Sequence, residues 1–272
     1  VRLANLWSQV TKVRGAVIHV DCSSMNWFDA HMAAALGIIV AAARVDGNTI
    51  SFENFSLRVS DVLRRNNFLQ PPVPDKQGTT IKFTSFSSED TDRFNVFVEE
   101  NINKYEIPIM SSQLEEKFFE GINEIFVNSA MHSESKVGIK CCGQFYPKRS
   151  RLDFSIADGG MGIQSNIKKH LKVEMEADEA INWAMKEGNT SRQLDVPGGL
   201  GLNIVKEFLE MNEGRFLVVS GRGYWAMASD GIETRLLPRS FPGTIATLEI
   251  RTDDDSCYYM ENEEAPFDEH DQ

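Results

Sequence analysis

The chain has 272 residues, of which 42% are hydrophobic and 25% charged, a composition typical of a globular protein. Its 28 Lys and Arg residues against 40 Asp and Glu residues give a net charge of −12, which disfavours nucleic-acid binding because that function needs clustered positive charge. Its 4 cysteines show no Cys-x-x-Cys spacing, so a zinc site or disulfide scaffold is not expected. We expect the cysteines to be reduced thiols in the cytoplasm.

The first 70 residues predict strands alternating with helices. We expect strands at 16–21 and 48–54, a helix over 29–47 that ends at Gly47, and a helix over 56–69. In the second helix, one apolar face should be formed by Leu57, Val59, Val62, Leu63 and Leu69. The longest apolar stretch, Met32–Ala43, is too short to cross a bilayer and no secretory signal precedes it, so no membrane association is expected.

A proline-rich break follows at Gln70–Thr80, "QPPVPDKQGTT". Three prolines in four residues cannot continue a helix. We therefore interpret residues 71–80 as a linker between a first domain, 1–70, and a second, 81–252. The last stretch, 253–272, is rich in acids and poor in apolar residues, which predicts a solvated acidic tail.

The second domain predicts helices first and strands afterwards. A strand is expected at 79–86 and helices at 88–104 and 111–135, the latter opened by a capping box of Ser112 and Glu115. Its apolar stripe consists of Leu114, Phe118, Ile122, Ile125 and Phe126. Strands at 137–146 and 151–158, a polar helical region at 164–197, a helix at 200–214, a hairpin at 215–229 and a strand at 243–251 follow. This order predicts an α+β sandwich with helices on one face of a mixed sheet.

Glu124 and Asn128 lie four residues apart and so share a face of the strongest helix, at the border of its apolar stripe. An amide oxygen can bind Mg²⁺, and a neighbouring carboxylate can take a proton from an attacking hydroxyl or water. The alternative is a solvated helix face, which is the commoner explanation for such a pair by itself.

Asp158 ends an apolar strand and is followed by Gly159, Gly160 and Gly162. Glycines let a flat ligand reach the backbone, and an ionised carboxylate selects a hydrogen-bond donor such as the exocyclic amine of adenine. An ordinary Asp-Gly turn between strands is the alternative.

Gly198, Gly199 and Gly201 open the helix predicted at 200–214. Free N–H groups at a glycine-rich helix start can bind phosphates. No Gly-Lys-Ser/Thr follows, so this is not a Walker loop, and a plain loop is the alternative.

Together these segments resemble the GHKL (histidine kinase/gyrase-like) ATP-binding family. The segments that carry the likeness are "NEIFVNSAMHS", "DGGMGI", "GGLGLNIV" and "PGTIATLEI", in that order. The resemblance implies a Bergerat-type α/β sandwich over 81–252 that binds ATP and Mg²⁺. Its size and the Glu124-x-x-x-Asn128-x-x-x-His132-Ser133 pattern are closest to the anti-sigma-factor serine kinases.

The resemblance also implies roles for individual residues. Glu124 would be the general base, Asn128 the Mg²⁺ ligand, and Asp158 the acceptor of the adenine amine, with Gly162 under the ring. Gly199 and Gly201 would lie against the phosphates with Leu200 between them, Thr244 would support adenine through water, and Arg192 in a lid at 188–192 would reach the γ-phosphate. Further nucleotide contacts are implied for His132, Gly160, Ile163, Thr190, Gly198 and Leu202.

The first domain resembles the STAS fold of anti-sigma-factor antagonists, in which an Asp-Ser pair at a helix start carries the phosphorylated serine. Here the matching pair is Asp29-Ala30, and alanine has no hydroxyl. Phosphorylation at this position is therefore not expected.

The resulting hypothesis is a cytoplasmic Mg-ATP-binding regulatory switch, with slow ATP hydrolysis or phosphotransfer to a protein serine. The expected partners are ATP or ADP and another protein, of the STAS-domain or sigma-factor-like kind, and a homodimer remains open. One alternative is a nucleotide-sensing interaction module that does not hydrolyse ATP. Another is a degenerate pocket in a protein that only mediates contacts, which the retained Glu124, Asn128 and Asp158 disfavour.

Overall fold

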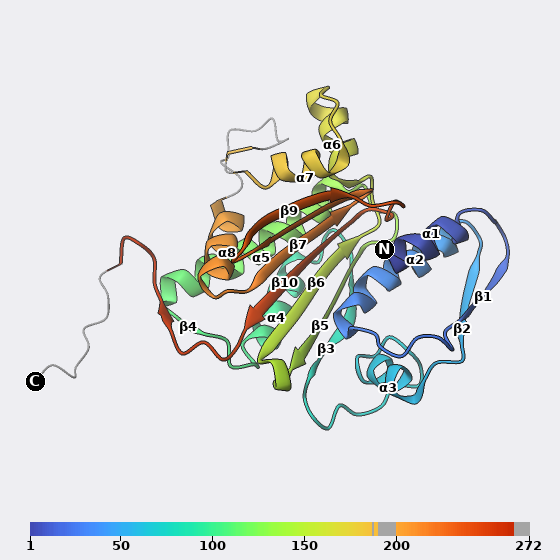
Figure 1. The fold of residues 1–272 in the computed structure, drawn as a ribbon, viewed down its shortest axis with the longest axis horizontal. Helices are drawn as coiled ribbons and strands as arrows, with labels where there is room; N and C mark the ends of the chain where they lie inside the picture. The colour runs from blue at the N-terminus through green and yellow to red at the C-terminus, as the bar shows by residue number, and fades with distance from the viewer. Residues whose placement is uncertain (187, 190–199, 264–272) are drawn as a thin grey trace, which may run out of the picture.

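The structure is a computed structural model that describes residues 1–186, 188–189 and 200–263. It is a mixed α+β fold built around one large sheet (Figure 1). The sheet has the strand order β3-β5-β6-β10-β7-β8-β9. The bounds of these strands are β3 Thr80–Phe86, β5 Ile139–Tyr146, β6 Arg151–Asp158, β7 Arg215–Ser220, β8 Gly223–Ala228, β9 Gly231–Leu236 and β10 Thr244–Arg251.

All neighbouring strands of this sheet run antiparallel. The expectation of a mixed sheet was therefore wrong. The tight turn at Gly221–Gly223 joins β7 to β8 as the sequence predicted, and β9 extends the same meander. Strand β9 is not predicted by the sequence, because its six residues are all exposed and lack the inward-facing apolar positions of a typical strand.

Helices cover both faces of the sheet: helices of the second domain pack on one face, as expected for that domain, and helices of the N-terminal segment cover the other. Successive residues of a strand point to opposite faces. On β5 and β6, Cys141 and Ile156 belong to one apolar core, and their neighbours Cys142 and Ala157 belong to another. The first core also contains side chains of α4 (Thr91–Ile102), α5 (Ser112–His132) and α8 (Leu200–Met211), and the second contains those of α2 (Ala33–Val45).

Helix α5 forms because its apolar residues repeat at helical spacing. Leu114, Phe118, Ile122, Ile125 and Phe126 are all buried, as predicted from the sequence. The helix begins at Ser112 with Ser111 as its N-cap, because the hydroxyl of Ser111, not that of Ser112, accepts the N–H of Leu114 at 3.1 Å. The proposed Ser112–Glu115 capping box is therefore wrong.

The N-terminal segment packs against the second face of the sheet. It comprises α1 (Arg2–Val10), β1 (Val17–Asp21), the 3₁₀ turn η1 (Ala30–Met32), α2, β2 (Thr49–Glu53) and α3 (Leu57–Arg65), with β1 and β2 paired in parallel. Within it, α2 ends as predicted, with Gly47 just beyond the helix at a φ of +75°. The buried His31 Nδ1 lies 3.2 Å from Asp153 Oδ2 on β6, where η1 packs against the sheet.

Helix α3 presents only part of its predicted apolar face to the core. Val59 and Leu63 are fully buried, but Leu57 is 89% exposed because it is the first residue of the helix, after the Ser56 cap. The segment 71–80 is held by Asp75, whose carboxylate accepts the Thr80 N–H at 2.7 Å and pairs with Arg65 at 3.4 Å.

The chain after β10 is only partly a free tail. Strand β11 (Cys257–Tyr258) pairs in parallel with β4 (Ile109–Met110), and Tyr258 packs into the aromatic core beside Phe208. The prediction of a solvated tail was thus wrong for this stretch, and residues 264–272 lie outside the described residues. Among the described helices, none combines the length and apolar character needed to span a membrane.

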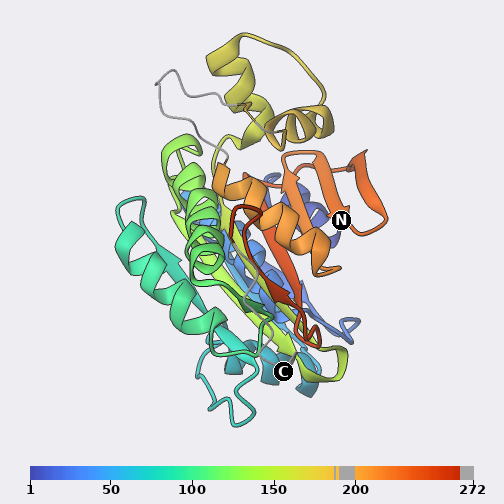
Figure 2. The same ribbon diagram turned by 90° about the vertical axis from the view of Figure 1, so that its left-hand side faces the viewer.

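Helices α6 (Gly162–Leu171) and α7 (Ala177–Ala184) lie beyond the ends of the strands in both views (Figures 1 and 2). Contacts between α7 and β8 hold this pair against the edge of the sheet. As a result, α5, α7 and the start of α8 surround one end of the sheet on its aromatic face.

Candidate functional site

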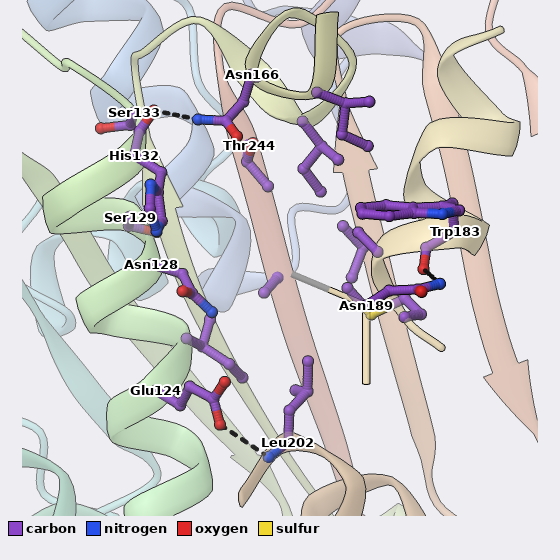
Figure 3. A pocket seen from close by; sticks show the side chains of 18 of the residues that line it. Glu124, Asn128, Ser129, His132, Ser133, Asn166, Trp183, Asn189, Leu202 and Thr244 are labelled. Atoms are coloured by element: carbon purple, nitrogen blue, oxygen red, sulfur yellow. Dashed lines mark hydrogen bonds between the residues drawn. The ribbon is translucent and has the colours of Figure 1, made fainter. Parts of the chain in front are cut away.

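A cavity of about 180 Å³ lies at this end of the sheet, enclosed by α5, α7, α8 and the strands β6, β7 and β10 (Figure 3). It brings together residues that are far apart in the sequence. Those predicted from the sequence are Glu124, Asn128, His132, Asp158, Gly162, Ile163, Leu202 and Thr244. Those that sequence analysis missed include Ser129, Asn166, Trp183, Lys186, Asn189, Asn203, Phe216, Val218 and Ala246.

One wall of the cavity is the polar face of α5. Glu124, Asn128 and His132 follow each other at four-residue spacing, so their side chains lie one above another along the helix (Figure 3). Glu124 Oε2 accepts the backbone N–H of Leu202 at 3.3 Å. This bond connects the carboxylate to the first turn of α8, whose N-terminal N–H groups have no partner within the helix itself.

Helices α5 and α8 touch backbone to backbone below Glu124. A Cβ placed on Gly121 would lie 2.2 Å from the carbonyl oxygen of Gly201, and one on Gly201 would lie 2.9 Å from Gly121 Cα. Both residues must therefore be glycine for the helices to cross this closely. The structure gives Gly201 a packing role beside the cavity, and the glycine inside α5 was the signal that sequence analysis overlooked.

Asp158 is almost completely buried, with 2% of its surface exposed, at the end of β6. Desolvation raises the pKa of its carboxyl to about 6, although hydrogen bonds from the Gly160 N–H, the Ser129 hydroxyl and the Thr244 backbone oppose that shift. A carboxylate in such a place accepts hydrogen bonds at neutral pH and becomes protonated under mildly acidic conditions.

The glycines after Asp158 serve two different purposes. A Cβ on Gly160 would lie 2.0 Å from the carbonyl oxygen of Ser133, so this glycine allows the turn to pack against the end of α5, and it does not line the cavity. Gly162 does line the cavity and has a φ of +77°, a conformation that glycine adopts without strain.

Ser220 links three elements at the far side of the cavity. Its hydroxyl lies 2.9 Å from Thr244 Oγ1 on β10 and accepts the N–H of Ile163 on α6 at 2.8 Å. Thr244 is thereby held at the cavity wall. The sequence predicted Thr244 from its motif but gave no sign of Ser220, whose contribution depends on the pairing of β7 with β10.

Trp183 on α7 faces α5 from the opposite wall (Figure 3). The Asn189 side chain donates to the Trp183 carbonyl at 2.9 Å, and Lys206 Nζ on α8 donates to the Met185 carbonyl at 2.7 Å. These bonds fix the end of α7 at the cavity. The sequence placed this region in a long polar stretch, where one aromatic residue carried no motif.

Four predicted site residues, Thr190, Arg192, Gly198 and Gly199, lie outside the described residues. Leu200 begins α8, but its side chain is also outside them. The expected lid and part of the phosphate segment therefore remain predictions from the sequence.

The described residues contain no cluster of three or more His, Cys, Asp or Glu side chains suited to a metal ion. Mg²⁺ commonly takes only one or two protein ligands and completes its shell with phosphate oxygens and water. Asn128, with Glu124 one turn away, is compatible with that mode of binding.

The Asp29-Ala30 pair lies at the start of η1 on the other face of the sheet. Asp29 Oδ1 accepts the indole N–H of Trp27 at 2.7 Å and the hydroxyl of Tyr146 at 3.0 Å. Ala30 is buried, so this position contributes packing. No protein-family model matches the chain, and no curated protein matches it significantly.

Proposed function

We propose that this chain is a Mg-ATP-binding regulatory protein of the GHKL type, with slow ATP hydrolysis or phosphotransfer to a protein serine. The observation that supports this most strongly is the meeting of Glu124, Asn128, Asp158, Gly162 and Thr244 in one cavity. These residues come from separate segments, and the family resemblance implies a catalytic role for Glu124 and nucleotide or Mg²⁺ contacts for the other four.

The cavity suits a nucleobase better than a whole nucleotide. Its 180 Å³ is below the roughly 300–1,000 Å³ typical of sites that enclose an entire ligand. Asp158 would accept the exocyclic amine, and the bare backbone of Gly162 would lie against the ring. The indole of Trp183 adds an aromatic surface on the opposite wall.

The α5 wall offers the groups needed at the triphosphate. Asn128 would hold Mg²⁺, which when bound neutralises phosphate charge and orients the γ-phosphate. Glu124 would take the proton from the attacking water or serine hydroxyl. Its bond to the Leu202 N–H would orient the carboxylate beside the start of α8, and the N–H groups of a helix N-terminus favour anionic phosphates.

One observation favours a second candidate, a nucleotide-sensing module that binds ATP without cleaving it. The Glu124 carboxylate on α5 accepts the Leu202 N–H of α8 and so links the two helices. A carboxylate in this place could transmit nucleotide binding from one helix to the other without accepting a proton. In either case a regulatory partner protein, of the STAS-domain or sigma-factor-like kind, would respond to the nucleotide.

Calorimetric titration with ATP and Mg²⁺, followed by an assay for ADP and for labelled serine, tests the proposal. Asp158→Asn should weaken binding about 10- to 100-fold, because it replaces a charged acceptor of the hydrogen bond by a neutral amide. Glu124→Gln should preserve binding and abolish product. Glu116→Gln, an exposed carboxylate on the same helix, is the matched control and should behave as wild type.

Each result has a distinct meaning. Binding without product in the wild-type protein supports the sensing module instead of the enzyme. Product formation that survives Glu124→Gln removes this residue as the base. A wild-type protein that shows no heat with Mg-ATP contradicts both candidates.

A further inference from the structure

A second, larger cavity of about 690 Å³ lies on the N-terminal side of the molecule and shares no lining residue with the first. Its walls come from the loop that precedes η1, from α3, and from the end of β5 with the 3₁₀ turn η2 (Pro147–Arg149). It is therefore a groove formed jointly by the N-terminal segment and the large sheet.

Aromatic side chains from both sides line this groove. Trp27 and Phe28 come from the loop before η1, and Phe145 and Tyr146 come from the end of β5. Trp27 is 43% exposed, yet its position is fixed by the bond from its indole N–H to Asp29 and by the Arg58 guanidinium 4.2 Å above its ring. A fixed, partly exposed tryptophan gives a partner a large apolar surface at low entropic cost.

The groove is also basic, in a chain whose net charge is −12. Arg65 is neutralised by Asp61 at 2.9 Å and Asp75 at 3.4 Å. The other three cations of the lining are Arg58, Lys148 and Arg149. Within the described part of the chain, none of these three forms a salt bridge with an Asp or Glu side chain. The groove is thus a local positive site on an acidic protein.

A ligand that matches this lining is an acidic peptide segment with one apolar anchor. The last nine residues of the chain, 264–272, read "EAPFDEHDQ". They contain acids at Glu264, Asp268, Glu269 and Asp271 around a single phenylalanine, Phe267, and no Lys or Arg. Their charge complements the three cations, and Phe267 complements the aromatic floor.

The described chain ends far from the groove. Glu263 is held at the start of α5, where its carboxylate accepts the Ser111 hydroxyl at 2.5 Å, next to β4 and β11. In Figure 1, β4 and α3 lie at opposite sides of the molecule. We propose that the groove binds the acidic C-terminal segment of a second copy of this chain, in a head-to-tail contact.

Sedimentation of the full-length chain over a range of concentrations at low salt tests this proposal. Wild type should self-associate, and salt should weaken the association because it screens charge. The groove variant Lys148→Glu/Arg149→Glu and the tail variant Asp268→Lys/Glu269→Lys should each raise the dissociation constant about tenfold or more, since like charges would face each other. The control is Arg2→Glu/Arg44→Glu, the same charge change at exposed residues outside the groove, and should associate as wild type.

A mixture of the groove variant with the tail variant gives the sharpest result. Acidic groove and basic tail are again complementary, so the mixture should form a heterodimer that neither variant forms alone. A mixture that stays monomeric, a groove variant that associates normally, or a control that is equally impaired would each overturn the proposal. Wild-type protein that is monomeric at every concentration would overturn the second copy as the source of the segment. None of these readouts depends on nucleotide binding.

Discussion

The two faces of the seven-stranded sheet differ in where large and small side chains lie in their cores. Towards α4, α5 and α8 the core is rich in large rings such as Phe94, Phe118, Phe126, Phe154 and Phe208. Towards α2 the core contains alanine at 33, 34, 35 and 157 beside larger residues such as Ile38 and Phe241. Large rings hold helices away from a sheet, whereas alanines let a helix backbone approach it. The cavity lies on the aromatic face, and the alanine face serves to attach the N-terminal segment.

The largest loss of stability is expected when a ring is removed from the aromatic core at Phe126. Its ring is fully buried and stacks on Phe94 with 4.2 Å between ring centroids. Phe126→Ala should lower the free energy of unfolding by about 3–5 kcal/mol, measured by urea denaturation. Val96→Ala on α4, where the side chain is 55% exposed, is the control and should change it by less than about 0.5 kcal/mol. A loss below about 1 kcal/mol at Phe126 would mean that the site can collapse around the gap.

On the alanine face, adding volume should be the damaging change. Ala34 is fully buried against the sheet. Ala34→Leu should cost about 1–3 kcal/mol of stability through overpacking. Because Ala34 belongs to the core opposite the cavity, nucleotide affinity of the folded variant should remain that of wild type. Val45→Leu at the exposed end of α2 is the control, and equal stability of the two variants would contradict close packing on this face.

The pKa of Asp158 makes a smaller prediction for the cavity face. Its carboxyl has a pKa of about 6, so it is ionised above pH 6 and protonated below. If the ionised form alone accepts the base, adenosine should bind about tenfold more weakly at pH 5 than at pH 7.5. Calorimetry with adenosine, which carries no phosphate to titrate, measures this, and Asp158→Asn should bind weakly with no such pH dependence.

The same pKa predicts the pH dependence of stability in the unliganded protein. A carboxyl whose pKa is higher in the folded state than in the unfolded state, near 3.8, keeps its proton longer when folded. The free energy of unfolding should therefore have a contribution that is present below pH 4 and lost as the pH rises to about 6. Comparing urea midpoints of wild type and Asp158→Asn across this range isolates it.

The smallest effect is expected at the edge strand β9, which belongs to neither core. Ile232 is 59% exposed, and every residue of this strand is exposed. Ile232→Thr should change the free energy of unfolding by less than about 0.5 kcal/mol. A larger loss would show that this edge is covered by a partner or by another copy in solution.

Much of the local structure could be predicted because its signals are local. The apolar repeat of α5, the turn at Gly221–Gly223 and the end of α2 at Gly47 each depend on residues close together in the chain. Neighbouring candidates were harder to separate, since Ser111 and Ser112 can both cap a helix and only the path of the chain selects Ser111. The direction of each strand and the side of the sheet on which α2 packs have no local signal.

For the site, the sequence by itself determined which polar residues could act together. The i, i+4 spacing on α5 and the carboxylate at the end of β6 are covalent properties of the chain that follow from helix and strand geometry. Only the tertiary structure decided that Trp183 faces α5, that Ser220 holds Thr244, and that Gly121 and Gly201 permit two helices to touch. These features depend on pairs of residues distant in sequence, and such pairs come together only when the cores on both faces of the sheet have packed.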